Sequence, residues 1–569
     1  MLDCEVISTD VFIVGAGAAG IFAATRAVEA GVDVLMATSG SLGKDSSATW
    51  MAGGGLQAAL YPPDSSTVHA EDTIRNGRYL SNQGLVYAIV EEAPRCIMDL
   101  EAWGEKFHKK NDRFVQYFLP GHTYARCFQR EKEKGVSYFG EEHHKVLPHH
   151  VRATEIPVLE DFLVVDLLTR GSRITGAVGI DLRKGEFKVI HSKVVILANS
   201  GYSACYKHYL TGPSVTGWGH GMACRAGAEF IDMEFIDFYP YVAVWPKLSI
   251  GGDWAAMARY ALSGKFYNKE GFEFWESYRK RGLTRAQAIF KEVEAGRGSP
   301  HGGTYLAFNY LPHNLIDSYL DTQRNAKWLT ELAALGFDLK KDAVEVYISV
   351  MSTLGGCKID EHCRTNVPGL YAAGELASGF DGAHTLAGNM MTFCFASGSI
   401  VGEAAVSEAK ESRLIDLDEA QVKELHKKAF LPIHRDKGIR PVTLKRRVRE
   451  IMWNSANVAG RTKEGLENAI GEIESLRMEQ LPQVYATNKN TKFNLEWAEC
   501  LEVENMLIVS EMTLKAALAR NESRGLHFRE DFPKLDPNLT KSVVVSQRDN
   551  GTSTKTEPID FSRLEPKGA

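Results

Sequence analysis

One stretch near the start constrains the fold more than any other: an apolar run, residues 11–14, leads directly into Gly15-Ala-Gly17-Ala-Ala-Gly20. The run predicts a buried parallel strand, and the apolar residues after Gly20 predict a helix. In such a unit Gly15 permits the tight turn, Gly17 lets the backbone approach a pyrophosphate, and Gly20 lets helix and strand pack closely. The helix N-terminus offers free N–H groups to phosphates. The pattern therefore predicts a dinucleotide-binding, Rossmann-like unit.

The totals of the chain favour a soluble protein of several domains. It has 569 residues, of which 44% are hydrophobic and 24% charged, typical of globular proteins. The net charge of −6, from 66 basic and 72 acidic residues, gives no electrostatic reason to expect nucleic acid or an anionic membrane as partner. We find no apolar run of about 18 residues and no signal-type segment. We therefore expect a cytoplasmic protein without a membrane span.

The nine cysteines are scattered, and no two of them form a C-x-x-C pair. A cluster-binding or structural zinc site needs such closely spaced thiolates. An odd number of cysteines also argues against a disulfide framework. We expect no metal site in this chain. Any iron–sulfur cluster must then belong to another protein.

Alternating strand and helix patterns indicate an α/β fold. A second strand, residues 32–37, ends at Thr38, whose hydroxyl can bond a ribose, although an ordinary strand-end threonine is the plainer interpretation. Further strands are predicted over 161–168, 173–180, 187–190 and 194–197, and the pattern returns at 369–375. Residues 235–350 interrupt this rhythm and are rich in aromatic side chains, which indicates an inserted domain. Residues 413–525 are charged and amphipathic, which predicts helices.

Several motifs taken together resemble the flavoprotein subunit of succinate dehydrogenase and fumarate reductase, a group that includes L-aspartate oxidase and adenylylsulfate reductase. They occur in the order of that family and cover nearly the whole chain, and the helical C-terminal part is closer to the succinate and fumarate enzymes than to adenylylsulfate reductase. The motifs are Gly15–Gly20 and residues 53–55, 195–198, 216–223, 233–240, 367–375 and 521–533.

The resemblance implies a Rossmann-like FAD-binding domain, an inserted α+β capping domain and a C-terminal helical domain. We expect the FAD-binding domain over 1–234 and 351–412 and the capping domain over 235–350. The helical domain should cover 413–540, followed by an extended tail over 541–569, in which residues 552–556 are expected to be extended or wrapped on a partner.

The resemblance also implies which residues bind FAD. The glycines would hold the pyrophosphate, Thr38 a ribose, and the Glu375 carboxylate the ribityl or ribose hydroxyls, although a plain helix cap is the alternative for Glu375. The helix beginning near Met390 would direct N–H groups at the flavin ring. The expected cofactor-binding set is Gly15, Gly17, Gly20, Thr38, Ser46, Thr49, Gly54, Gly55, Val165, Asn199, Trp218, Glu375, Asn389, Met390 and Met391.

The sequence departs from the family at its most characteristic positions. Ala48 stands where covalent members carry the histidine that attaches the flavin, so we expect FAD to be held noncovalently. Tyr239 and Met351 stand where the dicarboxylate enzymes have histidines, and Thr385 stands where they have an arginine. Gly282 stands at the position of their proton-donating arginine. Two carboxylates need fixed, charge-assisted donors, so fumarate and succinate are not the expected substrates.

The expected pocket is aromatic, with Tyr239, Phe238, Trp218, Met351 and His384, and it suits a larger substrate with a single acid or thioester group. Arg126, Arg281 and Arg285 are the candidate partners for an anion. His384 and Tyr239 are the candidates for proton transfer, with a helix-capping histidine and a core tyrosine as the alternatives. The predicted catalytic set is Tyr239, His384, Arg281 and Arg285.

These observations predict an FAD-dependent oxidoreductase that transfers a hydride between flavin N5 and a small-molecule substrate other than succinate or fumarate. Because the chain has no cluster-binding motif, we expect it to exchange electrons with an iron–sulfur protein. Two alternatives stay open. One is a non-catalytic FAD electron-transfer subunit with a vestigial pocket, and the other is an activity like that of adenylylsulfate reductase.

Overall fold

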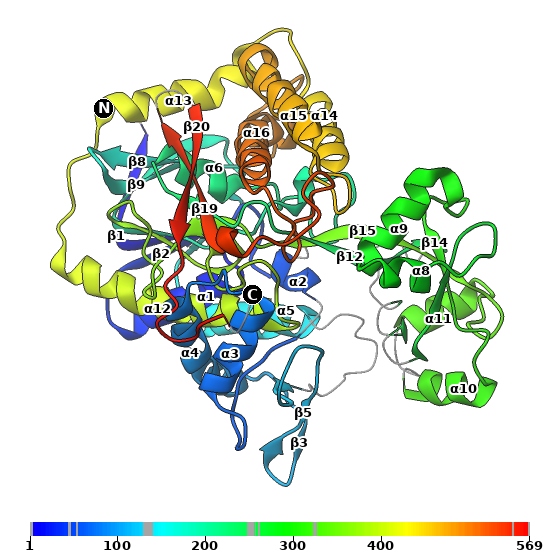
Figure 1. The fold of residues 1–569 in the computed structure, drawn as a ribbon. Coiled ribbons are helices and arrows are strands. Elements are labelled where there is room, and N and C mark those ends of the chain that lie inside the picture. Colours follow the sequence, from blue (N-terminus) through cyan, green and yellow to red (C-terminus); the bar gives the residue numbers. More distant parts are fainter. Residues whose placement is uncertain are drawn as a thin grey trace.

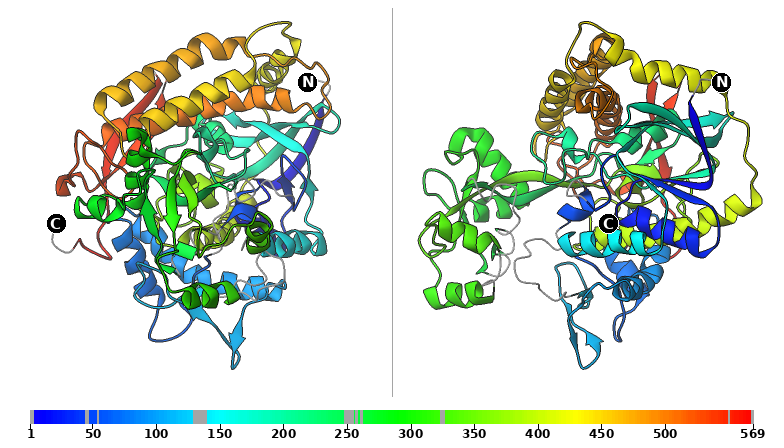
Figure 2. Two further views of the ribbon diagram at one scale, coloured as in Figure 1. Left: turned by 90° about the vertical axis from the view of Figure 1, so that its right-hand side faces the viewer. Right: turned by 180° about the vertical axis from the view of Figure 1, so that it is seen from behind.

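A computed structural model describes residues 4–43, 47–52, 55–128, 140–246, 255, 258–259, 262–322, 327–548 and 551–566. For residues 140–144, 322, 327–328 and 548 it describes the backbone only. The described chain forms a large body with a smaller lobe held out to one side (Figure 1). The right-hand view of Figure 2, from behind, shows that the lobe joins the body through a narrow connection.

A seven-stranded sheet organises the body. Strands β2, β1, β10 and β17 run parallel, and Val14 at the end of β1 lies opposite Ala37 and Leu197 at the ends of its neighbours. The carboxyl ends of these strands therefore meet at one edge of the sheet. In spatial order the strands are β7 (Val158–Leu159), β2 (Val34–Ala37), β1 (Glu5–Val14), β10 (Glu186–Leu197), β9 (Arg173–Asp181) and β8 (Phe162–Arg170), with β17 (Leu370–Ala372) beside β10.

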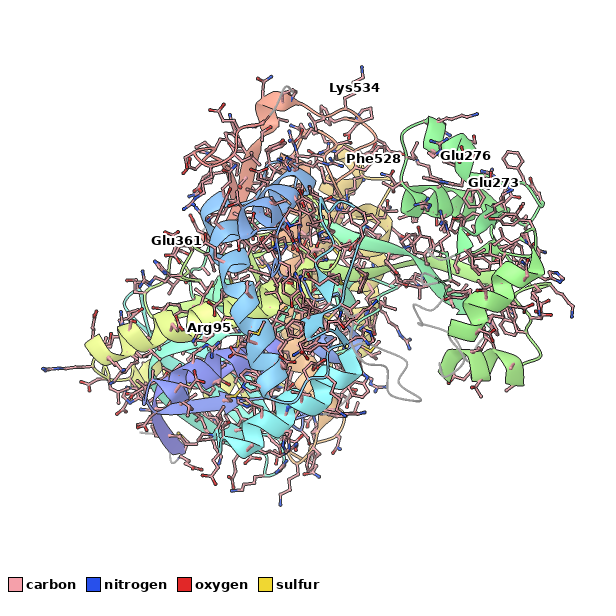
Figure 3. The ribbon with its side chains drawn as sticks, turned by 90° about the horizontal axis from the view of Figure 1, so that it is seen from below. Arg95, Glu273, Glu276, Glu361, Phe528 and Lys534 are labelled. Atoms are coloured by element: carbon pink, nitrogen blue, oxygen red, sulfur yellow. The ribbon has the colours of Figure 1, made fainter. Side chains whose placement is uncertain are left out.

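Helices α1 (Ala18–Glu29), α12 (Asn389–Glu411) and α4 (Gln83–Ala102) cover one face of this sheet. Ion pairs tie their outer sides, such as Arg95 of α4 to Glu403 of α12 at 2.6 Å (Figure 3). In the described part of the chain α12 alone is long and apolar enough to cross a membrane, but 72% of its apolar window is buried inside the protein. Its apolar surface is used in packing against α1 and α4, as in the core helix of a globular domain.

A second, five-stranded sheet lies in the body and contains the C-terminal hairpin. Strand β19 pairs antiparallel with β11 and with β20. Residues 541–548 and 551–558, which we expected within an extended tail, therefore add two strands to the sheet of their own chain. The order is β18 (Ala377–Ser378), β16 (Gly356–Lys358), β11 (Phe230–Ile231), β19 (Lys541–Arg548) and β20 (Gly551–Pro558).

The lobe is built on a four-stranded antiparallel sheet, and its two long strands β12 (Ile236–Trp245) and β15 (Val344–Thr353) also form the connection to the body (Figure 1). The lobe falls within the region that we expected as the capping domain. Its other elements are β13 (Lys265–Tyr267), α8 (Trp275–Lys280), α9 (Arg285–Glu292), β14 (Thr304–Ala307), α10 (His313–Thr322) and α11 (Lys327–Ala334).

Four helices of the C-terminal part pack above the sheet. Helix α16 (Leu495–Ala519) is surrounded by α13 (Glu419–His434), α14 (Pro441–Ser455) and α15 (Lys463–Ser475), and it is buried on nearly all sides. Shorter elements complete the fold: α2 (Ala48–Met51), α3 (Ser66–Asn76), β3 (Lys109–Lys110), β4 (Arg113–Phe114), β5 (Gln116–Tyr117), β6 (Cys127–Phe128), α5 (Gly140–Ala153) and α6 (Trp218–Arg225).

Candidate active site

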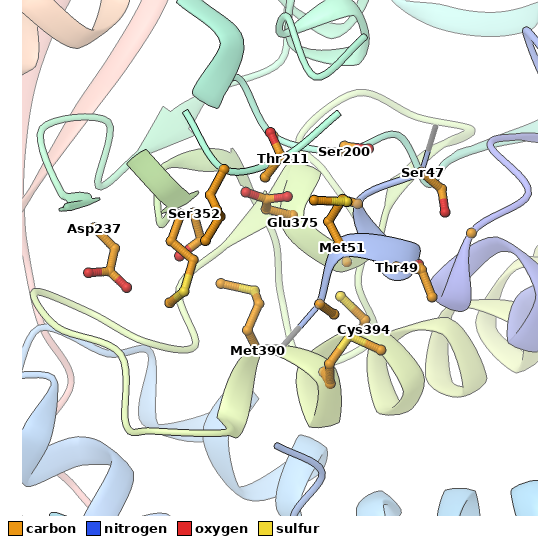
Figure 4. A pocket seen from close by; sticks show the side chains of 18 of the residues that line it. Ser47, Thr49, Met51, Ser200, Thr211, Asp237, Ser352, Glu375, Met390 and Cys394 are labelled. Atoms are coloured by element: carbon orange, nitrogen blue, oxygen red, sulfur yellow. The ribbon is translucent and has the colours of Figure 1, made fainter. Parts of the chain in front are cut away.

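A cavity of about 1510 Å³ opens at the carboxyl ends of β1, β10 and β17 and extends between the body and the lobe. This edge of a parallel sheet is where ligands of α/β proteins bind. Figure 4 shows Asp237 on the opposite side of the cavity from Ser47 and Thr49, with Glu375 and Met390 between them. Of the predicted site residues, the cavity wall contains Gly15, Gly17, Thr38, Thr49, Gly55, Asn199, Trp218, Tyr239, Arg285, Glu375, His384, Met390 and Met391.

The glycine turn has the geometry that the sequence predicts. Gly15 has a φ of +117°, and a Cβ there would lie 2.4 Å from the Ala198 carbonyl oxygen. A Cβ on Gly20 would lie 1.9 Å from the Gly15 carbonyl oxygen, which explains why helix α1 can approach the strand. The Ala18 N–H donates to the Thr49 hydroxyl at 3.1 Å. The turn thus forms a cradle at a helix N-terminus, suited to an anion.

The wall beside the cradle combines a buried amide with an aromatic ring. Asn199 Oδ1, just after β10, is buried and accepts no hydrogen bond. Because a buried polar atom without a partner is costly, this oxygen indicates a ligand donor. The Trp218 indole donates to the Val164 carbonyl at 2.7 Å. Val164 lines the cavity in place of the predicted Val165, whose side chain is buried outside the wall.

The Glu375 carboxylate lies deep in the cavity, where β17 ends. Its Oε1 accepts the Thr353 N–H at 3.1 Å and the Thr353 hydroxyl at 3.4 Å. Burial raises its pKa, while these hydrogen bonds act in the opposite direction. Only one carboxylate oxygen is engaged in these bonds, and the group faces the cavity. Glu375 is therefore placed to accept hydroxyl donors from a ligand.

Helix α12 begins at the cavity floor, where Met390, Met391 and Cys394 line the wall. Asn389, which we expected to bind the cofactor, points away from the cavity. Its Oδ1 accepts from His69 Nε2 at 2.9 Å, and its Nδ2 donates to the Thr73 hydroxyl at 2.8 Å. Asn389 therefore fixes the start of α12 to α3. Its influence on the cavity is to hold the first turn of α12 in place.

His384 lies in the part of the wall that faces the lobe. Its Nδ1 donates to the Thr385 carbonyl at 2.9 Å, because a carbonyl can only accept, and its own carbonyl accepts from Asn76 Nδ2 at 3.0 Å. These bonds engage Nδ1 and leave Nε2 as the ring nitrogen available to a ligand.

Sequence reasoning missed Asp237, a residue of β12 that lines the same wall. Its pKa is raised by burial, and the nearby His384 offsets part of the rise. The signal available in the sequence was an acid two residues before Tyr239, inside a motif that we had used only for the resemblance.

The three candidate arginines have different environments. Arg285 lines the cavity. Arg281 is absent from the wall, and its guanidinium lies over the Tyr278 ring with 5.4 Å to the ring centre. Arg126 is fully buried and pairs with Asp64 and Asp72 at 2.8 Å each, so its prediction as a cation available to a ligand was wrong.

The remaining predictions concern residues beyond this wall. Ser46 and Gly54 lie outside the described residues. In the part of the chain that is described, no group of three or more histidine, cysteine or acidic side chains is placed to hold a metal ion. All nine cysteines are free thiols.

Comparison with known proteins connects this geometry to a family. A family model described as FAD binding domain matches residues 10–391, and one described as fumarate reductase flavoprotein C-term matches residues 445–569. A fumarate reductase (CoM/CoB) subunit of Methanothermobacter marburgensis is 32% identical over 96% of this chain and 98% of its own length. An uncharacterized FAD-dependent oxidoreductase of Methanocaldococcus jannaschii is 31% identical over 98% of this chain and 99% of its own length.

Among solved structures, Mycobacterium smegmatis Sdh1 in complex with UQ1 superposes with a TM-score of 0.88 at 30% identity, covering 99% of this chain and 96% of that one. The matched models together span the cradle, the lobe, most of α14 and all of α15 and α16. The chain therefore belongs to the family of FAD-dependent oxidoreductases that contains the flavoprotein subunits of fumarate reductase and succinate dehydrogenase.

Proposed function

We propose that this chain is the flavoprotein subunit of an oxidoreductase that transfers a hydride between flavin N5 and an organic substrate other than succinate or fumarate, and exchanges electrons with an iron–sulfur protein. The observation that carries the proposal is the cavity wall facing the lobe. It holds Tyr239, Met351 and Thr385, none of which is a cation, and Arg285 is its one arginine among the described residues.

The cavity fits FAD, which supplies the hydride donor or acceptor when bound. The α1 cradle suits the pyrophosphate, Asn199 Oδ1 needs a donor, and Glu375 offers an acceptor for hydroxyls. The N-terminus of α12 directs N–H groups at the cavity floor, where they would favour negative charge on a bound ring. Ala48 has no nucleophilic side chain, which supports noncovalent binding.

The Asp237 and His384 side chains support proton transfer at the substrate end of the cavity. Nε2 of His384 is available because Nδ1 is held by the Thr385 carbonyl. Asp237 lies near enough to His384 for its charge to be felt, and burial raises the pKa of Asp237, which keeps a proton available closer to neutral pH. Tyr239, on the same strand as Asp237, is a second candidate acid. Arg281, outside the wall, is not proposed to act in this step.

Electrostatics argues against a four-carbon dicarboxylate. Each buried carboxylate needs a charge-assisted partner, and leaving a buried charge unpaired costs about 3–5 kcal/mol. Tyr239 and Thr385 offer neutral hydroxyls, and Met351 offers a thioether. A single arginine can pair with one carboxylate only. Several relatives are named fumarate reductases, so fumarate is the critical negative control for the proposal.

Two further features bear on the alternatives. The cavity of about 1510 Å³ exceeds the roughly 300–1,000 Å³ of ordinary ligand pockets, which favours a cofactor together with a substrate over a carrier with a filled pocket. Relatives named as subunits support a partner, and the scattered free cysteines leave the cluster to that partner. Nine free thiols also support a reducing, cytoplasmic location.

The test is anaerobic reoxidation of the purified, FAD-loaded chain after photoreduction. We expect fumarate to reoxidise the flavin no faster than buffer, and an unsaturated monocarboxylate to reoxidise it within turnover times. The matched variant Asp237→Asn should keep the oxidised flavin spectrum and lose at least 100-fold in that rate. Rapid reoxidation by fumarate would overturn the proposal. Response only to a reduced or oxidised ferredoxin would favour the electron carrier, and a flavin change only with sulfite and AMP would favour the sulfur chemistry.

A further inference from the structure

Among its described residues, the lobe contributes one cation to the cavity wall, Arg285. Arg285 is the first residue of α9, whose start is fixed by a capping box between Thr284 and Gln287. Its guanidinium lies over the face of Trp275, 4.7 Å from the ring centre. Trp275 and Tyr241 line the same part of the cavity. The cap and the aromatic rings therefore hold Arg285 in one orientation toward the cavity.

Half-buried Arg285 has no carboxylate partner among the described residues. Arg126, Arg225 and Arg520 each pair with at least one acid within 3.0 Å, and the fully buried Arg461 is instead held by backbone carbonyls. Across the described ranges no acid lies within ion-pair distance of Arg285, and its buried Nε atom has no hydrogen-bond partner. A buried donor left unpaired is costly. The site is thus prepared for an oxyanion that the protein itself does not supply.

Strand β12 connects the region of Arg285 with the end of the cavity proposed for proton transfer. Asp237, Tyr239 and Tyr241 follow one another along it at alternate positions and all line the cavity. The Tyr239 and Tyr241 rings meet edge to face with 5.6 Å between centres. Residues four apart in a regular strand lie roughly 13 Å from each other, and β12 has register shifts after Asp237 and after Tyr239. The wall from Asp237 to Tyr241, the tyrosine beside Arg285, is therefore elongated and aromatic.

We infer that the substrate is an elongated monocarboxylate with a flat, apolar body, whose carboxylate binds Arg285 beside Tyr241 and whose reacting carbon lies at the Asp237 and His384 end. The inference rests on the proposed function, because it places the substrate relative to the flavin. It differs from the four-carbon diacid geometry, in which both carboxylates lie close to the reacting carbons. Here the anion is held by the lobe and the chemistry occurs at the body.

The test uses a non-reacting probe and measures binding. The FAD-loaded protein is titrated with 4-phenylbutanoate and with its neutral amide, and the flavin difference spectrum gives the dissociation constant. We expect the acid to bind at least tenfold more tightly than the amide. Arg285→Gln should weaken the acid at least 30-fold and leave the amide unchanged, and Arg285→Lys should recover part of the loss, because only arginine gives the bidentate fork.

The control is Arg279→Gln, on the outer surface of the same lobe. Arg279 is exposed and pairs with Glu276 at 2.7 Å, and Figure 3 shows Glu276 on the periphery of the lobe. This variant should bind both probes like the wild type. Tyr241→Phe, which keeps the ring, should weaken the acid about threefold and serves if Arg285→Gln does not fold.

Two results would overturn the inference. One is equal binding of the acid and the amide by the wild type, and the other is an unchanged dissociation constant of the acid in both Arg285→Gln and Tyr241→Phe. If the probe fails to bind while an unsaturated acid reoxidises the flavin, the anchor is wrong and the proposed function stands. If the probe binds through Arg285 and no acceptor reoxidises the flavin, the anchor stands and the proposed function fails.

Discussion

Gly17→Ala separates cofactor binding from folding in a way that few substitutions in this cradle can. Gly17 is the N-cap of α1 with a φ of −86° and a ψ of −168°, a conformation that alanine adopts freely. A Cβ built there meets only the Thr49 hydroxyl, at 3.2 Å. We therefore expect the apoprotein to change in stability by no more than about 0.5 kcal/mol.

The same methyl group stands where a pyrophosphate would approach the turn. It would push the phosphate away from the N–H groups that begin α1, and each hydrogen bond to a charged group contributes about 1.5–3 kcal/mol. Losing two of them weakens FAD binding by about 3–6 kcal/mol, which corresponds to roughly 10²- to 10⁴-fold. Quenching of flavin fluorescence on titration with FAD measures the affinity, and the thermal midpoint of the apoprotein measures the fold.

Two neighbouring glycines supply the controls. Gly15→Ala combines a φ of +117° with a contact of 2.4 Å to the Ala198 carbonyl oxygen, so it should destabilise the apoprotein itself by about 3 kcal/mol. Gly31→Ala has a φ of +73° and nothing within 4 Å, so it should cost about 1–2 kcal/mol and leave FAD affinity unchanged. FAD affinity of Gly17→Ala within threefold of wild type would refute the placement of the pyrophosphate.

Three further predictions concern FAD binding and one buried carboxylate. Glu375→Gln keeps the shape of the side chain and should weaken FAD about tenfold by fluorescence titration, because an ionised acceptor makes the stronger hydrogen bond; unchanged affinity would remove its assigned role. Acid precipitation should release all flavin into the supernatant, and yellow colour on the precipitate would contradict noncovalent binding. Asp381 is buried, which raises its pKa to about 7. Between about pH 4 and pH 7 the folded state keeps a proton on this carboxyl that the unfolded state has lost, so the free energy of unfolding falls as the pH rises through this range. Asp381→Asn should therefore raise the free energy of unfolding at pH 8 by about 2–4 kcal/mol relative to wild type, seen as a higher thermal midpoint, and change it little at pH 4.5. An equal effect at both pH values would argue against the raised pKa.

The sheet and the glycine cradle could be predicted from the sequence because both depend on residues that are neighbours along the chain. The apolar run before Gly15 has no alternative to a buried strand, and steric contacts with Ala198 and with Gly15 itself require glycine at both ends of the turn. The hairpin of β19 and β20 was missed because β20 is polar and partly exposed and β19 has only the short apolar run Val543–Val545, whose place is fixed by pairing with β11. Pairing between residues more than 300 positions apart leaves no periodic signal near the hairpin.

The cavity wall was harder to predict, because the direction in which a side chain points depends on tertiary contacts. Asn389 and Met390 are neighbours in a helix, yet the first bonds to His69 and the second lines the cavity. Arg126 and Arg285 are both cations near the cavity, and only the positions of Asp64 and Asp72 make the first a structural residue. Sequence spacing carries no information on these partners.

The segment 381–391 explains how a substrate site can change while a cofactor site is kept. It contains His384 and Thr385 at the substrate end and Met390 at the cofactor end, so the two sites share one backbone. Its position is set from behind by α3, through Asn76 on the His384 carbonyl and through His69 and Thr73 on Asn389. Those anchors do not use the side chain of Thr385. A substitution at that position can therefore alter the charge offered to a substrate without moving the start of α12, so a neutral side chain at position 385 is compatible with FAD binding.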